Sequence, residues 1–178
     1  MSSLLKSDDT KYEYLFDGNN ISLLKDGGVV KSWKAVSGKD GYQSPEFQNV
    51  KGKGPIPEGE YDARQDEHSH MSLFDDIFAR AYPKVREIFP SLPKRMGAWT
   101  GGYNAWGADK IHLIPTGQQE MFGRDGFFIH GGTVPGSAGC IDLTDQNPNF
   151  MTKFLTLKRD IPLKVKYESK GKTEDPDE

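Results

Sequence analysis

The stretch that decides the fold of this 178-residue chain reads GFFIHGGTVPGSAGCIDL, from Gly126 to Leu143. It begins with an apolar run, Phe127–Ile129, of the length expected for a buried strand. The run delivers His130 to its end, glycines then turn the chain back, and the single cysteine, Cys140, follows ten residues after the histidine. This order predicts that an imidazole and a thiol meet in one groove.

A histidine beside a cysteine supplies what nucleophilic catalysis by a thiol needs. The pKa of an ordinary thiol is near 8.5, so an imidazole within hydrogen-bond reach is expected to convert it to the reactive thiolate. Gly139 lets a substrate carbonyl approach the backbone, where N–H groups around Gly139 and Cys140 would hold a developing oxyanion. For His130 or Cys140 alone, a buried structural role is the simpler interpretation. Packing does not explain the glycines around the thiol, although spacing leaves several classes of cysteine hydrolase open.

Composition predicts one folded, β-rich domain. The length suits a single domain, and apolar (35%) and charged (28%) residues are balanced as in a folded protein. The chain has 20 glycines and 11 prolines, which favours turns and short strands over a helical bundle. A single cysteine excludes an intramolecular disulfide framework and any site with several cysteine ligands.

Charge and hydropathy exclude two other classes. The net charge is −3 and the basic residues form no stripe, so no nucleic-acid partner is expected. No segment approaches the ~20 apolar residues of a membrane span, and the amino terminus lacks the apolar stretch of a secretory signal. We expect a chain made in the cytoplasm without a signal peptide.

Turn signals and periodicity place the elements. The expected strands cover 12–16, 20–24, 29–36, 60–64, 111–114, 127–129 and 162–167. A helical insertion is expected at about 72–89, capped by Ser72 and kinked or split by Pro83, with an apolar face that includes Phe74 and Ile77. A short helix after the cysteine, capped by Asn147, runs to about Leu157. We expect one domain over 1–167 and a charged, disordered tail over 168–178.

His130-Gly131-Gly132 followed by Ser137-Ala138-Gly139-Cys140-Ile141 resembles the His-Gly and Ser-His-Gly-Cys signature of the L,D-transpeptidase catalytic domain. The order excludes papain-like and NlpC-like peptidases, in which the cysteine precedes the histidine. Gly54–Tyr61 looks like that family's Pro-x-Gly-x-Tyr/Phe loop. Over roughly Leu15–Leu143 the chain looks most similar to the small signal-less branch delivered by type VI secretion systems. The resemblance implies a mainly β (β-rich α+β) fold, an L,D-transpeptidase-like sandwich or open barrel.

By that resemblance, Cys140 is the nucleophile, His130 its base, and the Gly131 carbonyl orients the imidazole. Ser137 braces the loop, and the backbone at Gly139 and Cys140 forms the oxyanion hole. Two residues depart from the family pattern: Ala138 replaces a histidine, and Asp142 stands where arginine is common. The predicted substrate contacts are therefore Arg124, which supplies the missing positive charge, together with Gly132, Asp142 and Trp106.

The resemblance also implies the reaction. Cys140 would attack the peptidoglycan tetrapeptide stem at the bond between diaminopimelate and D-alanine, leaving a thioester for water or an amine to resolve. It implies an antibacterial effector that reaches the periplasm of target bacteria by contact-dependent injection, with a cognate immunity protein and the secretion machinery as partners. No cofactor or metal is expected, and His68 and His70 suit a solvated loop better than a zinc site. The alternatives are a peptidoglycan endopeptidase or amidase with the same dyad and a non-catalytic wall-binding module.

Overall fold

The computed structural model describes residues 10–94 and 96–168. The strands within these ranges are β1 (Tyr12–Phe16), β2 (Asn20–Lys25), β3 (Gly28–Lys34), β4 (Val36–Gly38), β5 (Gly59–His70), β6 (Asp109–Pro115), β7 (Phe128–His130), β8 (Ser137–Asp142) and β9 (Ile161–Val165). The helices are η1 (Pro45–Phe47), α1 (Leu73–Ile88), α2 (Gly102–Trp106), η2 (Thr144–Gln146) and α3 (Asn147–Leu157).

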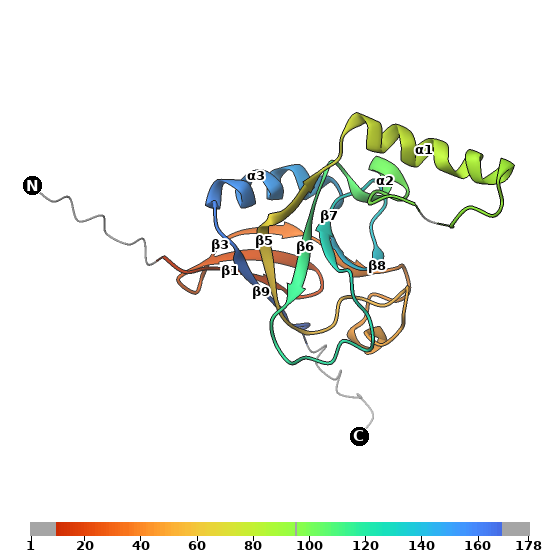
Figure 1. Ribbon diagram of the computed structural model, residues 1–178. Helices are drawn as coiled ribbons and strands as arrows, with labels where there is room; N and C mark the ends of the chain where they lie inside the picture. The colour runs from red at the N-terminus through yellow and green to blue at the C-terminus, as the bar shows by residue number, and fades with distance from the viewer. Residues whose placement is uncertain (1–9, 95, 169–178) are drawn as a thin grey trace, which may run out of the picture.

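The strands of the described ranges form one nine-stranded sheet in the order β3-β2-β1-β9-β5-β6-β7-β8-β4. The sheet curls around the core as a nearly closed barrel, with the helices outside it (Figure 1). Most pairs are antiparallel, but β1 pairs with β9 and β7 with β8 in parallel. This architecture confirms the mainly β fold expected from the sequence.

The first three strands form the predicted hairpins. Asp17 starts the first turn, where its carboxylate accepts hydrogen bonds from the backbone N–H groups of Asn19 (2.8 Å) and Asn20 (2.7 Å). Such Asx turns explain why an Asp-Gly-Asn segment separates two strands. Because β9 pairs with β1 on one side and β5 on the other, the last strand joins these hairpins to the rest of the sheet.

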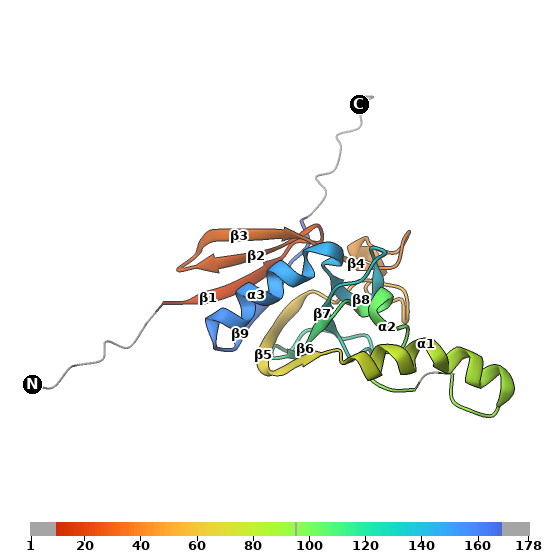
Figure 2. The ribbon, with the colours of Figure 1, turned by 90° about the horizontal axis from the view of Figure 1, so that it is seen from above.

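The core contains residues of the curled sheet and of α3, which packs against it. Phe150 and Phe154 of α3 are completely buried, and the Phe150 ring lies 5.0 Å from the rings of both Tyr14 and Trp33. Seen from above, α3 lies along the strands at the opposite end of the molecule from α1 (Figure 2). The helix predicted after the cysteine is therefore confirmed, but its cap is not. The Asn147 amide donates to the Asp109 carbonyl (2.9 Å), so the side chain ties α3 to β6.

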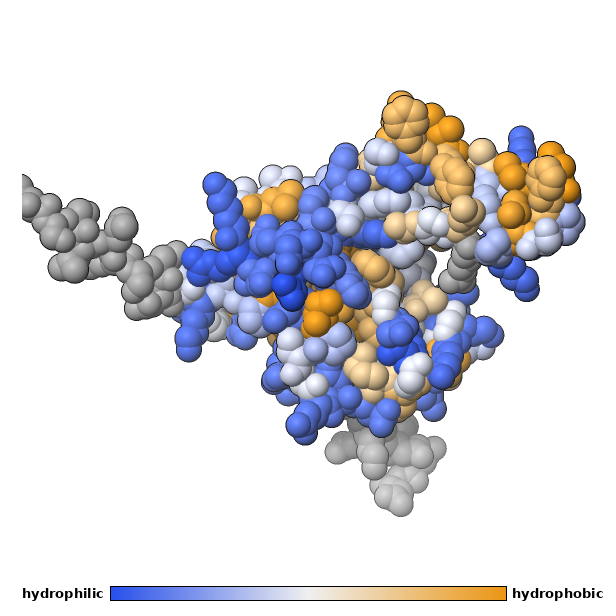
Figure 3. All heavy atoms as spheres, in the orientation of Figure 1, coloured by the Kyte–Doolittle hydropathy of each residue, from blue (hydrophilic) through white to orange (hydrophobic). Residues whose placement is uncertain are grey.

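Helix α1 differs from its expected form in two ways. The capping box of Ser72 and Asp75 starts the predicted helix, yet Pro83 does not split it, because the helix continues through the proline to Ile88. Its apolar face is not covered by the barrel, and Phe74 is 83% exposed. Figure 3 shows apolar side chains gathered on this projecting helix.

Several boundaries also differ from the sequence prediction. β8, which carries Cys140, was expected as a glycine-rich loop, and the short helix α2 was not predicted. β5 extends to His70 because its second half pairs with β6 beyond a register shift. Of the predicted tail, 168–178, all but Glu168 lies outside the described residues. Among the residues the structure describes, no helix is long and apolar enough to cross a membrane.

Candidate active site

Two neighbouring parallel strands bring the histidine and the cysteine together. In the β7–β8 register, Ile129 lies opposite Ile141, and both are completely buried in the core. Alternate residues of a strand point to opposite faces, so His130 and Cys140 lie on the face away from that core. Both line a cleft of about 720 Å³. The sequence prediction that they share one groove is consistent with this arrangement.

His130 is oriented by the backbone of the residue that follows it. Its Nδ1 donates a hydrogen bond to the Gly131 carbonyl (2.5 Å), and its ring packs 5.0 Å from that of Trp106. Because only 3% of His130 is exposed, burial lowers the pKa of its imidazole, and the nearby Lys110 ammonium lowers it further. Asp142 and the Gly131 carbonyl act in the opposite direction. The ring is thus held as a neutral base whose Nδ1–H donates to the Gly131 carbonyl.

Cys140 is a buried thiol that lines the cleft. Burial raises the pKa of this thiol to about 11, although polar groups of the Phe128 backbone and the Ser137 side chain act to lower it. At neutral pH the resting thiol is therefore protonated, whereas the sequence suggested a thiolate. Its proton must leave as the sulfur attacks. The Ser137 hydroxyl donates its proton to the Cys140 carbonyl (2.9 Å), which braces the strand that carries the nucleophile.

Gly139 has a backbone conformation and surroundings that only glycine accepts. Its φ is +108°, and a Cβ atom there would lie 2.4 Å from Nη2 of Arg124 and 2.7 Å from the Phe127 ring. Its carbonyl accepts a hydrogen bond from the Ser37 hydroxyl (3.2 Å), which in turn accepts one from the Ile56 N–H (2.8 Å). The backbone before the nucleophile is therefore closely packed and held in place.

Arg124 lines the cleft, but its guanidinium is engaged by the backbone. Nη1 donates to the carbonyls of Gln48 (2.5 Å) and Pro55 (2.6 Å), and Nη2 donates to the carbonyl of Gly54 (2.8 Å). The residue is 9% exposed and its guanidinium lies 5.2 Å from the Phe127 ring centre. This geometry makes Arg124 a brace between the Gly-Pro-rich loop and the strand of the nucleophile.

The carboxylate of Asp142 is likewise hydrogen-bonded to backbone groups. One carboxylate oxygen accepts from the Gly136 N–H (2.9 Å) and the other from the Thr144 N–H (2.8 Å), and only 1% of the residue is exposed. It borders a separate hollow beside Trp33 and not the cleft of Cys140. The structure therefore does not bring Asp142 together with the other predicted substrate contacts.

The segment from Gly97 to Trp106 forms one wall of the cleft. Trp106 faces the cleft and donates from its indole N–H to the Thr100 carbonyl (2.9 Å), while Trp99 packs edge-on against it, 6.3 Å between ring centres. Gly132 does not line this cleft; it approaches the Asn104 carbonyl so closely that a Cβ atom would lie 3.0 Å from it. Trp106 is thus the predicted aromatic residue best placed for contact with a substrate.

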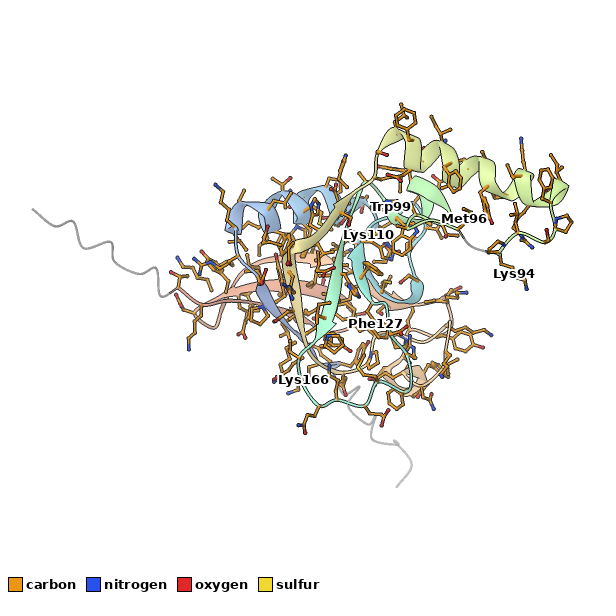
Figure 4. The ribbon with its side chains drawn as sticks, in the orientation of Figure 1. Lys94, Met96, Trp99, Lys110, Phe127 and Lys166 are labelled. Carbon is orange, nitrogen blue, oxygen red and sulfur yellow. The ribbon has the colours of Figure 1, made fainter. Side chains whose placement is uncertain are left out.

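Lys110, which the sequence analysis did not single out, lies immediately behind this wall. Figure 4 shows its side chain beside that of Trp99, and the ammonium lies 4.1 Å from the Trp99 ring centre. The only sequence signal is a lysine directly before the apolar run of β6, which does not distinguish a buried cation from an exposed one. His68 and His70 lie elsewhere, at the end of β5 and not in the loop expected from the sequence, and both contact Oδ1 of Asp109 (2.9 Å each).

Comparisons with known proteins give one family and several solved structures. A family model described as the Tlde1 domain matches residues 31–167. The chain is similar to Bd1075 of Bdellovibrio bacteriovorus (17% identity, TM-score 0.48, covering 93% of this chain and 52% of that one). It is also similar to L,D-transpeptidase 1 of Mycobacterium tuberculosis (13% identity, TM-score 0.44, covering 88% of this chain and 62% of that one). A third similar structure is an L,D-transpeptidase of Mycobacterium smegmatis (16% identity, TM-score 0.42, covering 88% of this chain and 59% of that one).

The chain thus spans between half and two thirds of the length of these solved structures. No curated protein sequence matches it.

Proposed function

Because the chain belongs to the Tlde1 domain family, we propose that it is a cysteine enzyme that modifies peptidoglycan stem peptides. The observation that carries this proposal is the cleft of about 720 Å³ lined by both His130 and Cys140. Its chemistry is acyl transfer through a thioester. The substrate bond is the one between diaminopimelate and the terminal D-alanine of a tetrapeptide stem.

The first half-reaction moves one proton twice. As the Cys140 sulfur attacks the carbonyl of the third stem residue, its proton passes to Nε2 of His130, whose Nδ1–H remains bonded to the Gly131 carbonyl. The oxyanion that forms is held by backbone N–H groups at Gly139 and Cys140. The amide C–N bond then breaks, and D-alanine leaves as an amine with the proton from His130. A thioester remains on Cys140.

The second half-reaction decides the product. Water adds its hydroxyl to the acyl carbon and returns a proton to the sulfur, which gives a tripeptide and L,D-carboxypeptidase activity. A D-amino acid or another stem adds its amine instead, which gives exchange or a crosslink. Trp106 is the side chain that we assign to contact with the stem, while Arg124 and Asp142 hold the loops around the cleft.

We further propose that the enzyme is an antibacterial effector of the type VI secretion class, consistent with its family. It would act in the periplasm of a target cell, and its producer would carry an immunity protein. Expression in the periplasm of a sensitive bacterium tests this role. Toxicity that disappears in Cys140→Ala supports it, and a wild-type protein as harmless as that variant would rule it out.

The reaction is tested by mass spectrometry of stem peptides from tetrapeptide-rich sacculi incubated with wild type or Cys140→Ala and a free D-amino acid. New tripeptides or exchanged tetrapeptides with wild type only are the expected result. Cleavage of crossbridges or of the lactyl amide would instead identify an endopeptidase or an amidase. Unchanged stems in both samples would favour a wall-binding module.

A further inference from the structure

Lys110 is a buried cation next to the proposed dyad. It lies on β6 directly opposite His130 of β7 in the antiparallel register, and only 4% of it is exposed. Its ammonium donates a hydrogen bond to the Ala98 carbonyl. Three aromatic rings surround the charge, with their centres at 4.1 Å (Trp99), 4.3 Å (Trp106) and 4.9 Å (Phe128).

This ammonium has no carboxylate partner within ion-pair distance among the described residues. Asp75, whose charge acts on it from the start of α1, uses its own carboxylate in the capping box with Ser72. Taking an ammonium out of water without an ion pair is costly, and cation–π contacts return only part of that cost. An apolar residue would fill the same space at less cost, so the charge itself needs an explanation.

Lys110 does not line the cleft, so it does not reach a bound stem. It stands behind Trp106, whose ring packs on that of His130 at 5.0 Å. Besides Asp75, the side chains that its charge acts on include both members of the dyad. On Cys140 it favours the anion, and on His130 it favours the neutral imidazole.

We infer that Lys110 is a positioning residue whose ammonium, together with burial, favours a neutral His130 that is ready to accept a proton, and stabilises negative charge on the sulfur of Cys140. This inference rests on the proposed roles of the dyad. Lys110 itself forms no bond with the substrate. Its charge moves to lower pH the range in which the thiol is able to give up its proton while the imidazole is able to accept it.

The other charged groups around the dyad act differently. Asp142, on β8, raises the pKa of both His130 and Cys140, so its carboxylate opposes Lys110 at each group. Burial lowers the pKa of Lys110, whereas the negative charges of Cys140 and Asp75 raise it. A variant that removes the ammonium therefore leaves Asp142 unopposed, and both the imidazole and the thiol should then hold their protons to higher pH.

The test measures iodoacetamide alkylation of Cys140 against pH in the full chain, because the protein contains no other cysteine. Lys110→Met removes the charge and keeps an apolar stem among the rings. Lys110→Gln also removes the charge but keeps a donor for the Ala98 carbonyl, and Lys110→Arg keeps the charge. Alkylation needs no substrate, so its outcome is independent of whether the protein acts on peptidoglycan.

We expect alkylation at pH 8 to be about ten-fold slower in the Met and Gln variants, which corresponds to one pKa unit. Lys110→Arg should stay within about two-fold of wild type, since a guanidinium keeps the positive charge. Lys31→Met is the matched control, because Lys31 also lies over an indole, that of Trp33 (5.2 Å), but is exposed on β3. In this control, Cys140 should be alkylated at the wild-type rate.

Two results would overturn the inference. One is a folded Lys110→Met or Lys110→Gln protein whose alkylation rates follow the wild-type curve, since Lys110 would then only pack the wall. The other is an equal slowing in Lys110→Arg, since the loss would then follow shape and not charge. If Lys110→Met does not fold, Lys110→Gln, which retains the hydrogen-bond donor, decides between these readings.

Discussion

Replacing Arg124 by methionine tests whether this residue holds the backbone around the cleft or binds the substrate through its charge. The guanidinium donates to the carbonyls of Gln48, Gly54 and Pro55 at 2.5, 2.8 and 2.6 Å. Each buried carbonyl left without a donor costs about 1–3 kcal/mol. Removing a buried charge returns part of that sum, so we expect the free energy of unfolding to fall by about 3–5 kcal/mol. For a chain of this length the melting temperature should fall by about 6–20 °C.

Urea denaturation and thermal melting followed by circular dichroism measure this loss. Arg80→Met is the control, because Arg80 is exposed on α1 in an i,i+4 pair with Asp76, and it should melt like wild type. Arg124→Lys should recover only part of the stability, since one ammonium does not replace a planar fork that binds three carbonyls. An Arg124→Met protein that melts like wild type but no longer processes stems would refute the brace and restore the substrate-binding role expected from the sequence.

Three further predictions concern the nucleophile and its strand. Gly139→Ala should abolish turnover and lower the melting temperature, because its Cβ would collide with Arg124 in a left-handed backbone; normal stem processing by this variant would contradict the packing described. In wild type, the alkylation rate of Cys140 should rise about ten-fold per pH unit from pH 7 to 9.5, because burial raises the pKa of the thiol to about 11. A plateau below pH 9 would show an ionised thiol instead. Asp142→Asn should lower stability by about 1–2 kcal/mol in urea denaturation, yet speed alkylation at pH 8, since the carboxylate raises the pKa of Cys140; slower alkylation would contradict that sign.

The strands and the family could be predicted from local pattern. Turn signals such as Asp17-Gly18-Asn19 mark hairpins directly, and the structure has strands at those places. The family resemblance, drawn from Gly54–Tyr61 and from the segments around His130 and Cys140, is confirmed by the match to the Tlde1 domain. These features depend on residues close together in the chain, which is why sequence alone was sufficient.

The environment of the site could not be predicted in the same way. Whether Arg124 meets a substrate or three carbonyls depends on a loop about 70 residues earlier in the chain. The burial of Lys110 depends on Trp99 and Trp106, which belong to a segment without clear periodicity. The apolar periodicity of α1 indicated a helix correctly. Periodicity alone does not say whether the apolar face is covered by other residues, and in the structure the side chain of Phe74 on this face is exposed.

The most direct measurement is the mass of the whole protein after it is mixed with a purified tetrapeptide stem and quenched in acid. The account predicts an adduct on Cys140 equal in mass to the stem less D-alanine, which hydroxylamine removes and which Cys140→Ala does not form. His130→Ala should form it far more slowly, since no base then takes the thiol proton. Release of D-alanine by Cys140→Ala at the wild-type rate would contradict the thioester and with it the central claim.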